Sequence, residues 1–140
     1  MSITNKEVKN EKFHSTNVTR HVRHTKNDAY ENLKVTKIIE APPEIKKIWG
    51  NIDPISDLDI KNLDKVILWI NEISNEQDYI LVQGEFGATF YIVDYCFKNN
   101  LIPVYATSVR RVEEIREGDK VLTNRVFVHE GYRKYIRYEK

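Results

Sequence analysis

The stretch from Tyr79 to Thr89, read as Tyr-Ile-Leu-Val-Gln-Gly-Glu-Phe-Gly-Ala-Thr, decides the fold expected for this chain. A short apolar run ends at Val82, two glycines follow at Gly84 and Gly87, and an amphipathic helical pattern then begins. A strand that feeds a tight glycine turn at a helix start brings free backbone N–H groups to the positive end of the helix. Such an element favours an anion, typically a phosphate.

A parallel βαβ unit is the expected setting of this turn. A second apolar strand is expected at 101–106, after a helix in which Phe90, Val93 and Phe97 share one face. Strand, helix and strand within about thirty residues make a parallel unit with a right-handed crossover. Upstream, the pattern predicts a weak strand at 12–16, a strand at 35–39 and a clear amphipathic helix from 63 to 73.

The C-terminal part of the chain changes character. Two extended segments, 109–117 and 120–129, flank Gly118-Asp119 and predict a β-hairpin, and 132–138 is expected to add an edge strand. The fold predicted from the residues is therefore an open α/β sheet, mostly parallel, with a C-terminal β-hairpin extension. It forms one domain over 1–140, in which 1–10 is a loose N-terminal segment and 109–140 the hairpin and edge strand.

Composition excludes several classes of protein. A net charge of +1, from 22 basic and 21 acidic residues, gives no reason to expect a long nucleic acid as partner. No apolar run approaches the ~20 residues of a membrane span, and no signal-peptide pattern is present. The single cysteine, Cys96, is expected to be a small buried hydrophobe. A cytoplasmic protein that does not bind membranes is the expectation.

Ligand-binding residues are expected where two neighbouring strands end, because ligands of open parallel sheets bind beyond the carboxyl ends of the strands. Glycines allow close approach to a phosphate, Gln83 suits a base edge or a ribose, and Phe86 can stack on a base. The candidates are Gln83, Gly84, Glu85, Phe86, Gly87, Ala88 and Thr89 from the first strand end, and Thr107, Ser108, Arg110 and Arg111 from the second.

Each candidate also has a structural interpretation. The two glycines can serve tight packing, Thr89 can cap the helix instead of touching a ligand, and Phe86 can pack under the loop. Arg110 and Arg111 can form a solvated strand edge instead of holding a phosphate. The carboxylate of Glu85 at the loop tip repels anions unless it points away.

Metal and cofactor sites are not expected. His21 and His24 lie three apart on a predicted helix, but no carboxylate or cysteine joins them at a convincing spacing. His14 and His129 are expected to be surface residues, either of which can carry a proton. The chain has no Walker loop, no complete dinucleotide fingerprint and no Ser/His/Asp motif.

Three blocks of sequence resemble a CRISPR-associated family, the Csx-twenty proteins. They are Ile-Trp-Gly-Asn-Ile-Asp-Pro at 48–54, Val-Gln-Gly-Glu-Phe-Gly-Ala-Thr-Phe at 82–90, and Leu-Ile-Pro-Val-Tyr-Ala-Thr-Ser at 101–108. The resemblance covers roughly 32–129. It implies a CARF-like, Rossmann-type fold and a homodimer acting in type III CRISPR defence. It further implies an enzyme, a ring nuclease that binds and cleaves the messenger cyclic tetra-adenylate.

Carried over by position, the resemblance places the ligand loop at 83–89, continued by Thr107 and Ser108, with the basic role at Arg110 or Arg111. Metal-free cleavage of RNA can use the substrate's own 2′-OH, and then needs in-line geometry and donors for the phosphate oxygens. Thr89, Ser108 and Arg110 are the donors expected to be catalytic. Two other functions use the same residues differently: a sensor or sponge that captures the ring without cutting it, and a structural protein whose glycines serve packing.

Overall fold

The computed structural model describes residues 12–15, 32–35 and 37–139. Its strands form one sheet in the order β2-β1-β3-β4-β5. The strands are β1 Lys12–Ser15, β2 Lys37–Glu40, β3 Tyr79–Leu81, β4 Ile102–Glu117 and β5 Lys120–Lys134. The helices are α2 Pro43–Gly50, α3 Ile60–Ile73 and α4 Phe86–Lys98.

The sheet is mixed, and the prediction of a mostly parallel, Rossmann-like sheet is wrong. The parallel pairings of β1 with β2, β1 with β3 and β3 with β4 join four, three and three residue pairs. The antiparallel pairing of β4 with β5 joins fourteen. The reason is the length of β4, which contains no Gly, Asn or Asp before Gly118 and continues through the expected break after Ala106.

Of the other elements predicted for the second half of the chain, two are confirmed and one is wrong. The parallel unit β3–α4–β4 is confirmed, and so is the hairpin turn at Gly118-Asp119, where Gly118 has φ +62°. The separate edge strand at 132–138 is wrong, because β5 runs without interruption from Lys120 to Lys134. The N-terminal segment 1–10 and the histidines His21 and His24 lie outside the described residues.

Helix boundaries follow from local chemistry. In α3 the buried residues Leu63, Val66 and Ile70 repeat at the spacing that places side chains on one helical face. The carboxylate of Asp59 begins this helix by accepting a hydrogen bond from the N–H of Asn62 at 3.2 Å. Pro43 suits the first turn of α2, because a first-turn N–H has no partner within the helix.

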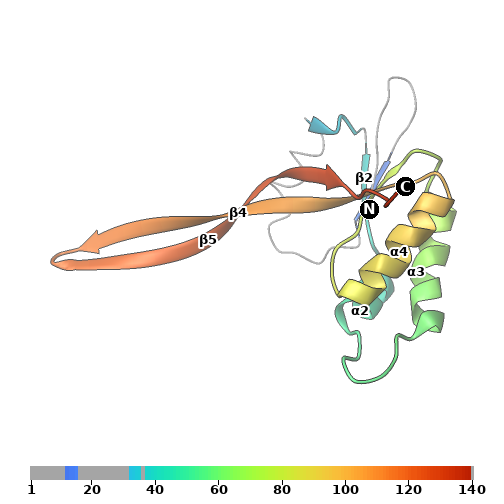
Figure 1. The fold of residues 1–140 in the computed structure, drawn as a ribbon, viewed down its shortest axis with the longest axis horizontal. Helices are drawn as coiled ribbons and strands as arrows, with labels where there is room; N and C mark the ends of the chain where they lie inside the picture. The colour runs from blue at the N-terminus through green and yellow to red at the C-terminus, as the bar shows by residue number, and fades with distance from the viewer. Residues whose placement is uncertain (1–11, 16–31, 36, 140) are drawn as a thin grey trace.

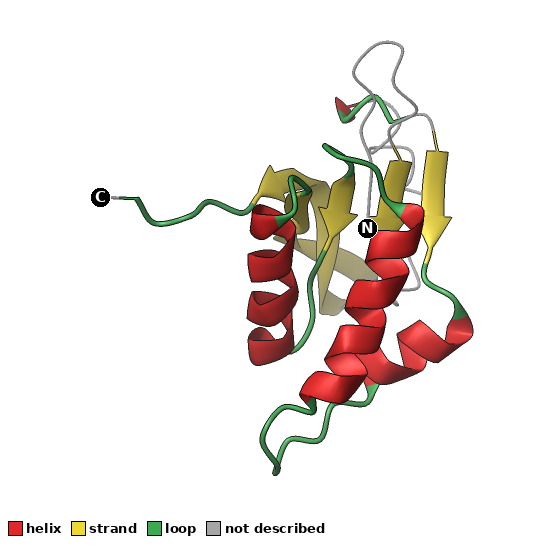
Figure 2. Cartoon of the chain, turned by 90° about the vertical axis from the view of Figure 1, so that its right-hand side faces the viewer, coloured by secondary structure: helices red, strands yellow, loops and turns green. Residues whose placement is uncertain are grey.

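The main core lies between the helices and one face of the sheet. All three described helices stand on the same side of the strands (Figure 2). Side chains of α2, α3 and α4 pack there against Ile80 and Val82 of the β3 segment, both fully buried. Burial of each such side chain contributes about 1.5–3 kcal/mol. Cys96 is buried in this core as predicted, and burial raises the pKa of its thiol.

The opposite face of the sheet carries a smaller cluster made of Val35, Tyr79, Leu81 and Val104. Beyond it, β4 and β5 leave the body as a long twisted ribbon (Figure 1). We call residues 108–129 the hairpin arm. Its ten paired levels, from Ser108 with His129 to Glu117 with Lys120, make it ~33 Å long at the usual rise of a strand.

Candidate functional site

Gln83, directly after β3, is the point where three parts of the chain meet. Its backbone carbonyl accepts a hydrogen bond from the indole Nε1 of Trp49 at 2.9 Å. Its side-chain Oε1 accepts another from the backbone N–H of Ala106, also at 2.9 Å. The carbonyl of the preceding Val82 accepts from the hydroxyl of Tyr135 at 2.5 Å. The start of the glycine turn is therefore held from α2, from β4 and from the end of the chain.

The two glycines of the turn differ in what packing demands of them, because Gly84 lies against the ring of Trp49 and Gly87 lies against the flexible end of Leu58. A Cβ added at Gly84 would lie 2.7 Å from Trp49 Nε1, and one at Gly87 would lie 2.9 Å from Leu58 Cδ1. Real Cβ atoms do not approach other atoms so closely. Packing thus accounts for Gly84, and a phosphate site has to be argued from other groups.

The positive end of α4 is already occupied by a carboxylate. Oε1 of Glu85 accepts hydrogen bonds from the backbone N–H groups of Gly87 and Ala88, the latter at 3.4 Å. Glu85 therefore caps the helix, and the capping role considered for Thr89 is wrong. An anionic ligand can reach these two amides only if the side chain of Glu85 moves away.

The remaining residues of the turn differ in what they offer. The side chain of Phe86 is 93% exposed, so the alternative that it packs under the loop is wrong. Ala88 is fully buried in the core and offers no side-chain contact to a ligand. The hydroxyl Oγ1 of Thr89 is buried and has no hydrogen-bond partner among the described residues. A buried polar group without a partner costs about 1–3 kcal/mol, and a hydrogen bond to this hydroxyl would offset that cost.

The candidates on β4 do not lie at a strand end, because β4 continues past them. Thr107 Oγ1 donates to the carbonyl of Gly131 at 3.2 Å. The guanidinium of Arg110 stacks over the ring of Phe127 at 5.2 Å, and Arg111 forms an ion pair with Glu130 at 3.2 Å. At ~3.3 Å per residue Arg110 lies ~13 Å beyond Ala106, and therefore on the hairpin arm.

Strand alternation separates the predicted catalytic residues. Val104 belongs to the cluster on the face away from the helices, and Ser108 and Arg110 follow it at even spacing on that face. Thr89 lies on α4, on the other side of the sheet. Within one chain the structure does not bring Thr89 together with Ser108 and Arg110. Thr107 and Arg111 are the predicted residues of β4 that share the helical side.

A group of aromatic residues near Val82 was missed in the sequence. The rings of Tyr105 and Tyr135 lie 4.8 Å apart, and the guanidinium of Arg133 stacks over Tyr105 at 5.8 Å. Burial, with a smaller effect of Tyr105, raises the pKa of Tyr135 to about 12. Trp49 and Tyr135 lie 34 and 53 residues along the chain from the backbone carbonyls that they contact. No local spacing in the sequence predicts these two contacts.

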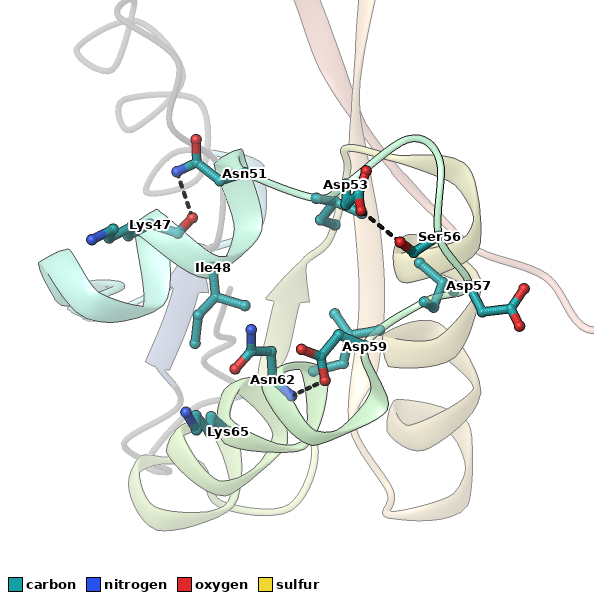
Figure 3. A pocket seen from close by; sticks show the side chains of 12 residues that line it. Lys47, Ile48, Asn51, Asp53, Ser56, Asp57, Asp59, Asn62 and Lys65 are labelled. Carbon is teal, nitrogen blue, oxygen red and sulfur yellow. Dashed lines mark hydrogen bonds between the residues drawn. The ribbon is translucent and has the colours of Figure 1, made fainter.

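A cavity of about 570 Å³ lies beside the turn, between the end of α2, the loop 51–59 and the start of α3 (Figure 3). Leu58 lines this cavity and also contacts the position of Gly87. Asp53 points its carboxylate at Ser56 and at the N–H of Ile55, and these hydrogen bonds lower its pKa. Among the residues that the structure describes, no group of three or more possible ligands suits a metal ion.

The fold and site define an α/β protein with a capped glycine turn pinned at the end of a parallel strand. Residues 13–133 match the uncharacterized protein MJ1673 family, and the chain belongs to this family. It is 42% identical to the uncharacterized protein MJ1673 of Methanocaldococcus jannaschii over 113 residues, which cover 80% of this chain and 87% of that protein. No solved structure matches the chain. Across the described residues, each helix is too short or too polar to cross a membrane.

Proposed function

We propose that this protein is a cytoplasmic ring nuclease, which binds the cyclic tetra-adenylate messenger of type III CRISPR defence and cleaves it without a metal. One observation carries the proposal. The three blocks that resemble the Csx-twenty proteins, at 48–54, 82–90 and 101–108, converge on Gln83 through the contacts of Trp49 and Ala106. The turn beside this meeting point is exposed at Gly84, Glu85 and Phe86, where a ligand can enter.

Adenine recognition falls to Gln83 and Phe86. An exposed phenyl ring can stack on a base, and such stacking is worth about 1–3 kcal/mol per base. The Oε1 atom of Gln83 is held by Ala106, which fixes the plane of the amide and leaves its NH₂ group to donate to a base edge.

Phosphate contacts are assigned to the groups on the helical side of the sheet. The amides of Gly87 and Ala88 become available when the phosphate displaces Glu85, and Thr89 and Thr107 add donors. The freed carboxylate then lies beside the substrate and can accept the proton of the attacking 2′-OH. In this step the O2′–P bond forms, the P–O5′ bond breaks and the leaving 5′-oxygen takes a proton from water, which leaves a 2′,3′-cyclic phosphate and a 5′-hydroxyl. The carboxyl of Glu85 then returns its proton to the solvent.

The resemblance to the Csx-twenty proteins also implies a homodimer. A two-fold axis gives such a dimer two equivalent glycine turns, each of which can bind a ring.

A second function, a sensor or sponge that binds the ring without cutting it, is favoured by the separation of Thr89 from Ser108 and Arg110. Incubation of pure protein with labelled cyclic tetra-adenylate, with and without EDTA, distinguishes the two. Linear products ending in a 2′,3′-cyclic phosphate in both reactions support the nuclease. A ring that is bound but still intact after long incubation supports the sensor.

Phe86→Ala, compared with Phe127→Ala on the hairpin arm, provides a matched control for the binding turn, because both rings are largely exposed. We expect affinity for the ring to fall about tenfold in the first variant only. Absence of any binding or thermal shift with cyclic tetra-adenylate in the wild type contradicts both functions.

A further inference from the structure

The hairpin arm lacks the support that a β-ribbon needs. It projects from the body with its strands paired only to each other (Figure 1), and every residue from Ser108 to Glu117 is exposed. Two-stranded ribbons are marginal in water, and stability normally requires a further strand or a packed face. The arm nevertheless carries exposed apolar side chains, among them Val109, Ile115 and Leu122, which are 38, 46 and 52% exposed.

Alternation divides these side chains between two faces. Residues paired across an antiparallel ladder share a face, and successive residues alternate. What we call the inner face continues the helical side of the sheet. It consists of Val109 with Val128, Arg111 with Val126, Glu113 with Asn124, Ile115 with Leu122, and Glu117 with Lys120 at the tip. The outer face consists of Ser108 with His129, Arg110 with Phe127, Val112 with Arg125, Glu114 with Thr123, and Arg116 with Val121.

We propose that the inner faces of two arms, from two copies of this chain, pack against each other about a two-fold axis at the level of Val112. The order of side chains along the inner face carries the argument. An axis at this level, lying across the arms, places Arg111 of one copy over Glu113 of the other, and does so twice. The apolar level of Val109 and Val128 then covers the apolar level of Ile115 and Leu122.

Charge and apolar surface are therefore matched by one operation. The guanidinium of Arg111 already contacts Glu130 of its own chain, and its five donors allow a second carboxylate partner. An isologous interface requires this kind of self-complementary pattern. Coverage of the apolar levels also removes from water the side chains that leave the free ribbon unsupported.

The outer face has no such pattern. The same two-fold operation applied there stacks Arg125 of one copy on Arg125 of the other, since both lie at the level of the axis. An axis one level farther out opposes Arg110 with Arg116. The outer face carries three arginines and one glutamate, so two outer faces repel each other. The inner face is therefore the one assigned to the contact with a second copy.

The same geometry brings the tip of each arm to the body of the other copy. The two-fold rotation about the level of Val112 places Glu117 and Lys120 of one chain beside Thr107 of the other, next to the glycine turn. Two aromatic side chains of α4 are exposed near this place: Phe86 at 93% and Phe90 at 74%. They share a helical face with Phe97, which contacts Arg137 in the segment after β5.

The test is sedimentation equilibrium of the full chain without nucleotide, so that its outcome does not depend on the proposed function. We expect a dimer, twice 16.6 kDa, for the wild type. Arg111→Glu and Glu113→Arg should each weaken it about tenfold or more, because two symmetry-related attractions become repulsions. The double swap Arg111→Glu with Glu113→Arg should restore the dimer, which a merely structural role of either residue does not explain.

Matched controls come from the outer face. Glu114→Arg makes the same charge change one residue away and should leave the dimer intact. Ile115→Lys should dissociate it, and Val112→Lys should not. Circular dichroism reports whether each variant folds. If Ile115→Lys fails to fold, the charge swap of Arg111 and Glu113 still tests the proposal.

A distance measurement fixes the orientation. Nitroxide labels on Asp119→Cys, in a chain with Cys96→Ala, should lie ~40 Å apart, since each tip is six to seven residues from the axis. A wild type that stays monomeric, a dimer indifferent to the swaps, or adjacent tips overturns the proposal.

Discussion

The glycine turn and the hairpin arm are held in opposite ways. The turn at 83–87 is fixed by hydrogen bonds from Trp49, Ala106 and Tyr135, which come from three distant parts of the chain. The arm is held by interactions between its own two strands, which are the ladder and the cross-strand contacts of Arg110 and Arg111. Substitutions in the turn should therefore change the folding of a single chain, whereas substitutions in the arm should change association.

The largest effect is expected at Trp49, whose side chain is 5% exposed and contacts the turn. Trp49→Ala removes a large buried ring and the donor to Gln83, and should lower the free energy of unfolding by about 3–5 kcal/mol. Urea denaturation measures this loss when the substitution is made in a chain that stays monomeric. Val121→Ala on the arm, where the side chain is 53% exposed, should change the same quantity by less than about 0.5 kcal/mol. Equal losses at the two sites contradict the comparison.

Gly84→Ala should destabilise the chain next most strongly. The new methyl group would lie 2.7 Å from Trp49 Nε1, and overpacking of this kind costs about 1–3 kcal/mol. Gly50→Ala is the control, because nothing lies within 4 Å of its added Cβ and Ala favours a helix. If Gly84→Ala leaves the midpoint of thermal denaturation unchanged, the indole ring of Trp49 can move aside without cost.

These contacts also mark the limit of what the sequence can predict. Periodicity identified α3 through Leu63, Val66 and Ile70, and the strand–turn–helix at 79–98 is found where the pattern placed it. The full length of β4 was missed, because Thr107-Ser108 resembles a strand end by composition, while pairing with Gly131 and His129 keeps the backbone extended. Trp49 and Tyr135 act across distances in the chain at which no single-sequence pattern operates.

Glu85→Gln should move stability and ligand affinity in opposite directions. Loss of the charged cap should lower the free energy of unfolding by about 1 kcal/mol, since an amide oxygen is a weaker partner for the helix amides. Affinity for cyclic tetra-adenylate should rise severalfold, because no carboxylate competes with the phosphate for Gly87 and Ala88. Calorimetry measures the second effect. A loss of affinity places the phosphate elsewhere.

Turnover by the same variant separates the two proposed functions further. If Glu85 accepts the proton of the 2′-OH, Glu85→Gln binds the ring more tightly and cleaves it at least about a hundredfold more slowly. Faster cleavage in step with tighter binding means that the carboxylate only competes for the site.

Tyr135 should make stability depend on alkaline pH. Its pKa is raised to about 12, so the neutral phenol is favoured in the folded chain. This contribution is fully present below the ordinary tyrosine pKa of ~10 and is lost as the pH rises toward 12. Tyr135→Phe should cost about 1 kcal/mol at neutral pH through the lost bond to Val82 and should flatten the decline above pH 10. An unchanged alkaline profile contradicts this assignment.

The smallest effect is expected where turn and arm meet in the proposed dimer. Lys120 of the partner subunit would lie beside Thr107, where it adds a cation close to the glycine turn. Lys120→Ala should then weaken binding of cyclic tetra-adenylate only about threefold at low salt, with the difference fading at high salt, because an exposed charge is screened. Arg116→Ala, at the same end of the arm but on its outer face, should have no such effect. An equal loss of affinity in both variants would mean that the arm acts through its overall charge. A loss of affinity confined to Lys120→Ala, in a chain that still dimerises, would mean that Lys120 of the partner subunit belongs to the same site as the glycine turn.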